Sequence, residues 1–145
     1  MNAYQYVMRY LAKYPKTEQE LRIRLFQKWY STEEVQRTFA SLKKQGYLND
    51  EMFTEWYLRT QLASKGKPIF LVKKKLEQKG ISSELIEKYL TDNQDDIQKG
   101  IDDKIKKDIV QYKKKWVEWF DIIQKLLKKW YRLDDIKNVI EKRKK

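Results

Sequence analysis

Apolar side chains recur along this chain at the three- and four-residue spacing of helices that bury one face. Leu21, Leu25 and Trp29 lie four residues apart, and Val35 and Phe39 continue the same spacing. Residues three or four positions apart share one side of an α-helix, so the pattern predicts an all-α protein. We expect helices near residues 3–14, 17–29, 31–45, 50–65, 68–79 and 82–91, with further helix over 95–143.

Start and stop signals divide these helices. Two capping boxes, in which each side chain accepts from the other residue's backbone N–H, predict helix starts at Thr17 with Glu20 and at Ser31 with Glu34. Three glycines suit the left-handed conformation that ends a helix, and they are Gly46, Gly66 and Gly80.

The same apolar pattern returns about every fifty residues. Leu21 corresponds to Val72 and Ile122, at offsets of 51 and 50 residues. This spacing predicts three tandem three-helix repeats at 1–50, 51–96 and 97–145, with a helix break near 115–118. Neither Gly nor Pro occurs after Gly100, so a single helix through residues 97–131 is the alternative. Repeats of this size share apolar faces when they stack, which predicts an elongated, curved body. Trp29 and Trp130 hold equivalent positions and are expected to pack between repeats.

Charge narrows the range of partners. The chain has 33 Lys and Arg against 21 Asp and Glu, a formal charge of +12. Residues 1–50 carry +4, residues 51–96 carry zero and residues 97–145 carry +8. Lysine runs near the second helices of the last two repeats predict a sequence-independent stripe for a nucleic-acid backbone or an acidic protein groove. These runs include Lys73, Lys74, Lys75, Lys125, Lys128 and Lys129, and a further run ends the chain at Arg143, Lys144 and Lys145.

The sequence offers little for catalysis. It has no Cys and no His, which removes thiol nucleophiles, Cys/His metal sites and the commonest proton-transfer group. Its adjacent Asp pairs do not converge on one helix face, and no glycine-rich phosphate loop occurs. We therefore expect a monomeric, cytoplasmic binding protein that is not an enzyme, uses no cofactor or metal, and does not enter a membrane.

Two segments resemble a known family. The first runs from Leu42 through Gly46-Tyr47-Leu48 to Phe53, and the second is Ser64-Lys65-Gly66-Lys67, followed by the Leu76–Ile81 segment. Over residues 17–90 the chain resembles the RecX regulatory protein family, whose members consist of three tandem three-helix repeats. The resemblance implies a partner, the RecA recombinase filament on single-stranded DNA, whose ATPase, strand-exchange and co-protease activities such proteins inhibit, with consequences for DNA repair, homologous recombination and the SOS response.

The resemblance and the charge pattern together define a candidate binding face. The resemblance carries over Lys65, Lys67, Lys73 and Lys79 as basic positions, and Arg59 as a structural partner. Phe70, beside the lysine run and off the buried row, is a candidate anchor for a protein partner. Two other functions stay open: a nucleic-acid-binding helical module without a protein target, and a helical scaffold for an acidic protein.

Overall fold

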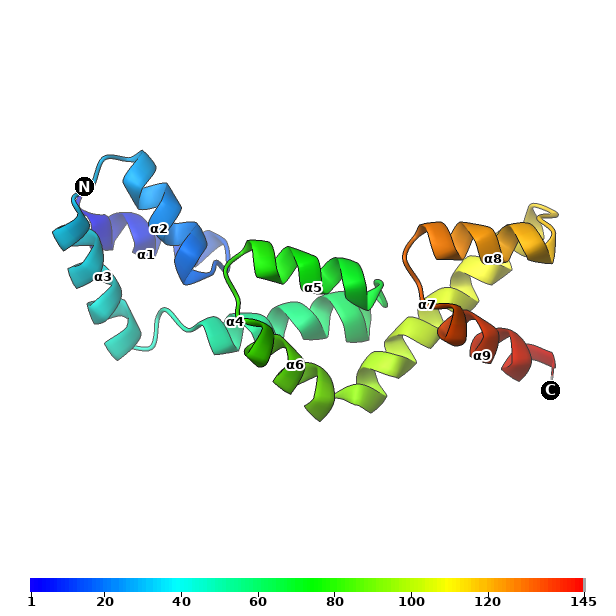
Figure 1. Cartoon of the computed structure of the whole chain (residues 1–145). Coiled ribbons are helices and arrows are strands. Elements are labelled where there is room, and N and C mark those ends of the chain that lie inside the picture. Colours follow the sequence, from blue (N-terminus) through cyan, green and yellow to red (C-terminus); the bar gives the residue numbers. More distant parts are fainter. Residues whose placement is uncertain (145) are drawn as a thin grey trace.

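The chain forms an elongated, curved body made of helices, as the computed structural model in Figure 1 shows. The structure describes the backbone of residues 1–144 and the side chains of residues 1–142. No strand occurs among these described residues, and the predicted fold class, an elongated body of three-helix repeats, is confirmed.

The helices follow one another in three groups of three, which we call the first, second and third units. The first unit contains α1 (Ala3–Lys13), α2 (Glu18–Gln27) and α3 (Thr32–Lys44). The second contains α4 (Asp50–Leu58), its π-helical continuation η1 (Arg59–Ser64), α5 (Ile69–Gln78) and α6 (Ser83–Asp92). The third contains α7 (Gln94–Lys114), α8 (Trp119–Lys128) and α9 (Leu133–Lys144). The predicted break near 115–118 is confirmed, and α2, α5 and α8 follow one another along one edge of the body (Figure 1).

The predicted capping boxes differ in outcome. Thr17 and Glu20 form the reciprocal pair that the sequence predicts. Ser31 accepts from the Glu34 backbone N–H, but the Glu34 carboxylate accepts instead from the backbone N–H of Ala3 at 3.0 Å. The second half of this box is therefore used to hold α1 against α3.

Three helices end in the left-handed conformation at a tryptophan. Trp29, Trp116 and Trp130 have φ values of 67°, 62° and 77° and follow α2, α7 and α8. After α8, the Tyr131 N–H donates to the Leu126 carbonyl and the Trp130 N–H donates to the Leu127 carbonyl, the bonding pattern of a Schellman cap. Gly80 holds the matching position after α5, with φ of 89°.

The hydrophobic core has two parts. One lies within the first unit and includes Leu21 and Leu25, whereas the other runs without interruption through the second and third units. The corresponding positions Leu21, Val72 and Ile122 are all buried, in agreement with the repeat that the sequence predicts.

The junction between the first and second units is polar, which corrects the expectation that stacked units share apolar faces throughout. The Thr17 hydroxyl donates to the Lys79 carbonyl at 2.6 Å, and the Lys79 ammonium lies 3.0 Å from a Glu20 carboxylate oxygen. Trp29, predicted to pack between units, is 93% exposed. The expectation for Trp29 was wrong because the junction is formed at the N-terminal end of α2, by Thr17 and Glu20, whereas Trp29 follows the C-terminal end of that helix.

The junction between the second and third units is tight and largely apolar. A Cβ on Gly100 of α7 would lie 2.4 Å from the backbone oxygens of Leu62 and Ala63 in η1, so only glycine allows this approach. The buried Tyr131 hydroxyl donates to the Gly66 carbonyl at 2.7 Å, and burial raises the pKa of Tyr131. These contacts fix α8 relative to α5.

Candidate functional site

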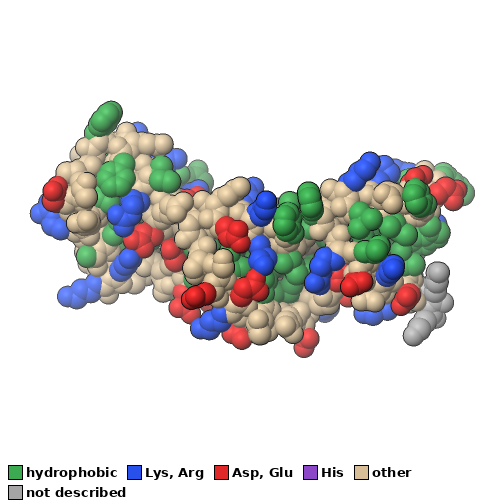
Figure 2. All heavy atoms as spheres, in the orientation of Figure 1, with side chains coloured by type: hydrophobic (Ala, Val, Ile, Leu, Met, Phe, Trp, Pro, Cys, Tyr) green, Lys and Arg blue, Asp and Glu red, His purple; other side chains and the backbone are tan. Residues whose placement is uncertain are grey.

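A groove of about 570 Å³ lies between α5 and α8, at the junction of the second and third units. We call it the α5–α8 groove. Its floor and walls include Tyr57, Leu71 and Tyr131. Figure 2 shows hydrophobic side chains gathered where the ends of α5 and α8 approach each other, with Lys and Arg side chains around them.

Lysines from both units line this groove. The second unit contributes Lys67 and Lys75, and the third unit contributes Lys104, Lys128 and Lys129. Asp108 is the one acidic residue in the lining, so five positive charges face a single negative one. Like charges gathered in a concave surface raise its positive potential, which favours an anionic ligand.

Asp108 organises part of this lysine cluster. The Asp108 side chain is only 9% exposed. Its carboxylate accepts a hydrogen bond from the Lys104 ammonium at 2.8 Å and lies 3.2 Å from the Lys129 ammonium. The side chain of Tyr112 raises the pKa of Lys129, burial opposes this effect, and Asp108 adds to it. Lys129 therefore stays positively charged, and Asp108 holds its ammonium group at the groove. Lys67, Lys75 and Lys128 are exposed to solvent.

An exposed aromatic pair borders the groove. The Phe70 ring of α5 stacks on the Trp130 indole after α8, with centroids 5.0 Å apart and planes 25° apart. Their side chains remain 44% and 56% exposed, and the Lys74 ammonium lies 5.1 Å from the Phe70 ring centroid. The sequence correctly predicts Phe70 as exposed and Trp130 as a contact between units.

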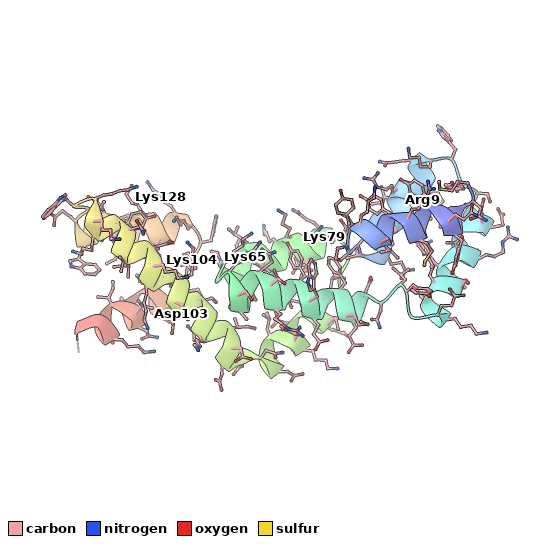
Figure 3. All side chains as sticks on the ribbon, turned by 180° about the vertical axis from the view of Figure 1, so that it is seen from behind. Arg9, Lys65, Lys79, Asp103, Lys104 and Lys128 are labelled. Atoms are coloured by element: carbon pink, nitrogen blue, oxygen red, sulfur yellow. The ribbon has the colours of Figure 1, made fainter. Side chains whose placement is uncertain are left out.

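The predicted site residues divide into those at the groove and those elsewhere. Lys67, Lys75, Lys128 and Lys129 line it, and Figure 3 shows Lys65 beside Lys104 near the middle of the body, with Lys128 further along on α8. Lys65 is exposed directly after η1, next to Gly66, whose absent Cβ would meet the Lys104 side chain.

The remaining predicted lysines have partners within the chain. Lys73 forms an ion pair with Glu87 of α6, and Lys125 lies 6.0 Å from the centre of the Tyr112 ring. Lys79 is held by Glu20 at the polar junction, away from the groove (Figure 3). The terminal run Arg143, Lys144 and Lys145 lies outside the residues whose side chains are described.

Sequence reasoning missed Lys104, Asp108 and Leu71 of this site. Lys104 and Asp108 lie on α7, and only the close packing of α7 on η1 brings them to the groove. Leu71, which is 41% exposed, lines the groove beside Lys75. Its exposure one residue before the buried Val72 is the sequence signal that could have identified it.

The arrangement is suited to binding an extended anion. Within residues 1–142 no group of three or more acidic side chains is placed to hold a metal ion. No described helix combines the length and apolar character that a bilayer crossing requires.

Arg59, predicted as a structural partner, lies 4.0 Å from Glu55 on the same helical stretch, so its partner is local.

Fold and groove together define a class: an all-helical protein of tandem three-helix units with a basic groove between the second and third. Comparisons with known proteins identify the family. Residues 3–42 match the model of the first three-helix domain of RecX, and residues 49–90 match that of the second. The chain therefore belongs to the RecX family.

Individual relatives agree with this assignment. The regulatory protein RecX of Pasteurella multocida is 39% identical over 85 residues, which cover 58% of this chain and 51% of the relative. The RecX protein of Clostridium perfringens strain SM101 is 34% identical over 79 residues, which cover 54% of this chain and 36% of the relative. This chain thus spans between about a third and a half of these two relatives.

The fold extends the likeness beyond the matched segments. The crystal structure of RecX from Lactobacillus salivarius superposes with a TM-score of 0.77 over 97% of this chain and 93% of that one, at 22% identity. The third unit, which lies outside these two matched segments, thus has the same fold as its counterpart there.

Proposed function

We propose that this chain binds a RecA filament on single-stranded DNA through the α5–α8 groove and inhibits the ATPase and recombinase activities of RecA. It acts by binding, as a monomer, and catalyses no reaction of its own. A RecA partner implies action in the cytoplasm, where it limits homologous recombination and the SOS response.

The groove itself carries this proposal. Five lysines from two units converge on one concave surface, and only Asp108 offsets them. Neither unit alone has more than three of these lysines, so the rigid junction is needed to assemble the site. A long, negatively charged partner can contact both units at once, and an elongated body offers the length to follow a filament.

Electrostatic attraction and shape have separate parts in this mechanism. Lysine ammonium groups attract phosphates without reading sequence, because a point charge has no fixed hydrogen-bonding fork. This type of contact suits a filament that forms on DNA of any sequence. A body bridging neighbouring RecA subunits restricts the movements that accompany ATP turnover.

The test is RecA ATPase on single-stranded DNA, titrated with three forms of this chain. The groove variant carries Lys67→Glu, Lys75→Glu and Lys128→Glu, three exposed lysines without an ion pair among the described contacts. The control variant carries Lys44→Glu, Lys99→Glu and Lys137→Glu, which change the net charge equally but lie outside the groove lining. We expect inhibition by wild type and control, and loss of inhibition in the groove variant.

Two results would contradict the proposed function or the role of the groove in it. No inhibition by the wild-type chain at any concentration rejects RecA inhibition and leaves a nucleic-acid-binding module or a scaffold for an acidic protein. Equal loss of inhibition in both variants means that net charge, rather than the groove, is responsible.

A further inference from the structure

The exposed aromatic pair at the edge of the groove lies outside the hydrophobic core. Phe70 and Trp130 belong to different units, stack on one another at 5.0 Å and are each about half exposed. Exposed aromatic side chains are costly to leave in water, and stacked rings present a flat apolar surface of fixed orientation. Such a surface is suited to a planar ligand.

The backbone at Trp130 has a conformation that is unfavourable for a residue with a Cβ. Its φ of 77° is a conformation that favours glycine, and Gly80 occupies the equivalent position in the second unit. The chain thus places its largest side chain where the backbone disfavours any Cβ. The same conformation occurs at Trp29 and Trp116, but of the three tryptophans only Trp130 lines the α5–α8 groove and stacks on another ring.

The charges around the pair define the ligand. Lys74 lies over the Phe70 ring, and Trp130 forms part of the wall of the α5–α8 groove beside Lys128 and Lys129. Phe70 covers one face of the Trp130 indole, and 56% of the Trp130 side chain is still exposed. A ligand that fits has a flat aromatic part next to a negatively charged backbone.

We infer that the Phe70–Trp130 pair is a stacking platform for an unpaired base of single-stranded nucleic acid, whose phosphates lie along the lysines of the groove. This inference builds on the proposed function and adds a specific contact with the strand. Every base has a π-face, so stacking adds affinity without sequence preference. A duplex keeps its bases stacked inside, so the platform predicts preference for single strands.

The experiment measures binding of oligothymidylate and of an abasic oligonucleotide of equal length by fluorescence anisotropy, without RecA. Trp130→Gly removes the indole and places glycine where the backbone already favours it, so the variant is expected to fold. Trp29→Gly makes the same change at the equivalent position of the first unit, away from the groove, and serves as the matched control. Phe70→Leu removes the second ring while keeping an apolar side chain.

We expect Trp130→Gly to weaken oligothymidylate binding roughly tenfold, within the range of base–aromatic stacking, with a smaller loss for Phe70→Leu. Abasic binding and the Trp29→Gly variant stay at the wild-type level. The inference is overturned if wild type binds the two oligonucleotides equally, or binds neither.

Failure of the platform and failure of RecA inhibition are distinguishable, because the oligonucleotide assay contains no RecA. If Trp130→Gly abolishes RecA inhibition but leaves oligothymidylate binding unchanged, the aromatic pair contacts protein and the stacking inference is wrong. If base stacking is seen but wild type does not inhibit RecA, the platform stands and the proposed function fails.

Discussion

Single residues in this chain take backbone conformations that their side chains disfavour. Trp29 and Trp130 end helices where the second unit has Gly80, and Trp116 ends a helix where the second unit has Gly66. A left-handed conformation costs a residue with a Cβ about 1–2 kcal/mol. Trp29 and Trp116 are 93% and 91% exposed and recover little of this cost by packing.

At Trp29 the strain can be measured directly. We expect Trp29→Gly to raise the free energy of unfolding by about 0.5–1 kcal/mol, because glycine relieves the strain but gains freedom in the unfolded chain. Urea denaturation measures the difference. Trp29→Ala is the control, since alanine keeps the Cβ and therefore the strain; equal stability of the two variants would contradict this account.

At Gly100 a substitution is expected to lower the free energy of unfolding. A Cβ there would lie 2.4 Å from two backbone oxygens of η1, so Gly100→Ala must push α7 away from the second unit. We expect a loss of about 1–3 kcal/mol, the usual cost of overpacking. Lys99→Ala, an exposed neighbour on α7, should change stability little. An unchanged free energy of unfolding in Gly100→Ala would instead show that α7 can move away from η1 at little cost.

The sequence revealed only part of this residue-scale picture. Gly66 and Gly80 are recognisable as helix ends because glycine favours the left-handed conformation. Tryptophan has no such preference, so nothing in the local sequence identifies Trp116 or Trp130 as a helix end. The role of Gly100 depends on η1, some forty positions earlier in the chain, and is invisible to periodicity.

At the scale of helices, the two junctions differ in chemistry. The second and third units share one core, whereas α2 meets α5 through hydrogen bonds and the ion pair of Lys79 with Glu20. Burial raises the pKa of Glu20, but hydrogen bonds from Lys79 and from the Thr17 backbone outweigh it, so the pKa is lowered from 4.5. The first junction is therefore expected to weaken as the Glu20 carboxylate is protonated.

The sign of this response follows from the lowered pKa. A carboxyl group whose pKa is lower in the folded state stabilises that state fully above its unfolded value, and the effect is lost as pH falls through the folded value. We expect hydrogen-exchange protection at the α5 C-terminus to fall below about pH 4.5, while protection in α8 persists. Glu20→Gln should remove the pH dependence; an unchanged profile would contradict the role of Glu20.

Helix positions were largely predictable, because apolar spacing and caps are local signals. The break between α7 and α8 emerged from the repeat even though no Gly or Pro marks it. The polar junction was not predictable, since its contacts join residues 59 and 62 positions apart. The π-helical form of η1 has no signal in the sequence that we can identify.

At the scale of the whole molecule, the proposed function depends on where the lysines converge and not on net charge alone. The sequence indicates a basic edge along the second helices, and Lys75, Lys128 and Lys129 of this edge line the α5–α8 groove. Lys67, which the family resemblance adds, lines it as well. It could not separate these from Lys79 and Lys73, which are paired within the chain. Only the three-dimensional arrangement makes that distinction.

Salt dependence tests the electrostatic part of the account. If the four uncompensated groove charges each meet one phosphate, the slope of log affinity against log salt for single-stranded DNA is about −3, at roughly −0.7 for each phosphate. The groove variant should reduce that slope by about 2, and the control variant should keep it. A slope near zero for wild type would show that phosphate contacts are unimportant.

Filament binding through the α5–α8 groove is tested by the affinity of this chain for a preformed RecA filament on single-stranded DNA, measured by anisotropy of the labelled chain. We expect tight binding by wild type and by the variant with Lys44, Lys99 and Lys137 reversed, and at least tenfold weaker binding when Lys67, Lys75 and Lys128 are reversed. Equal affinity of all three forms would contradict it.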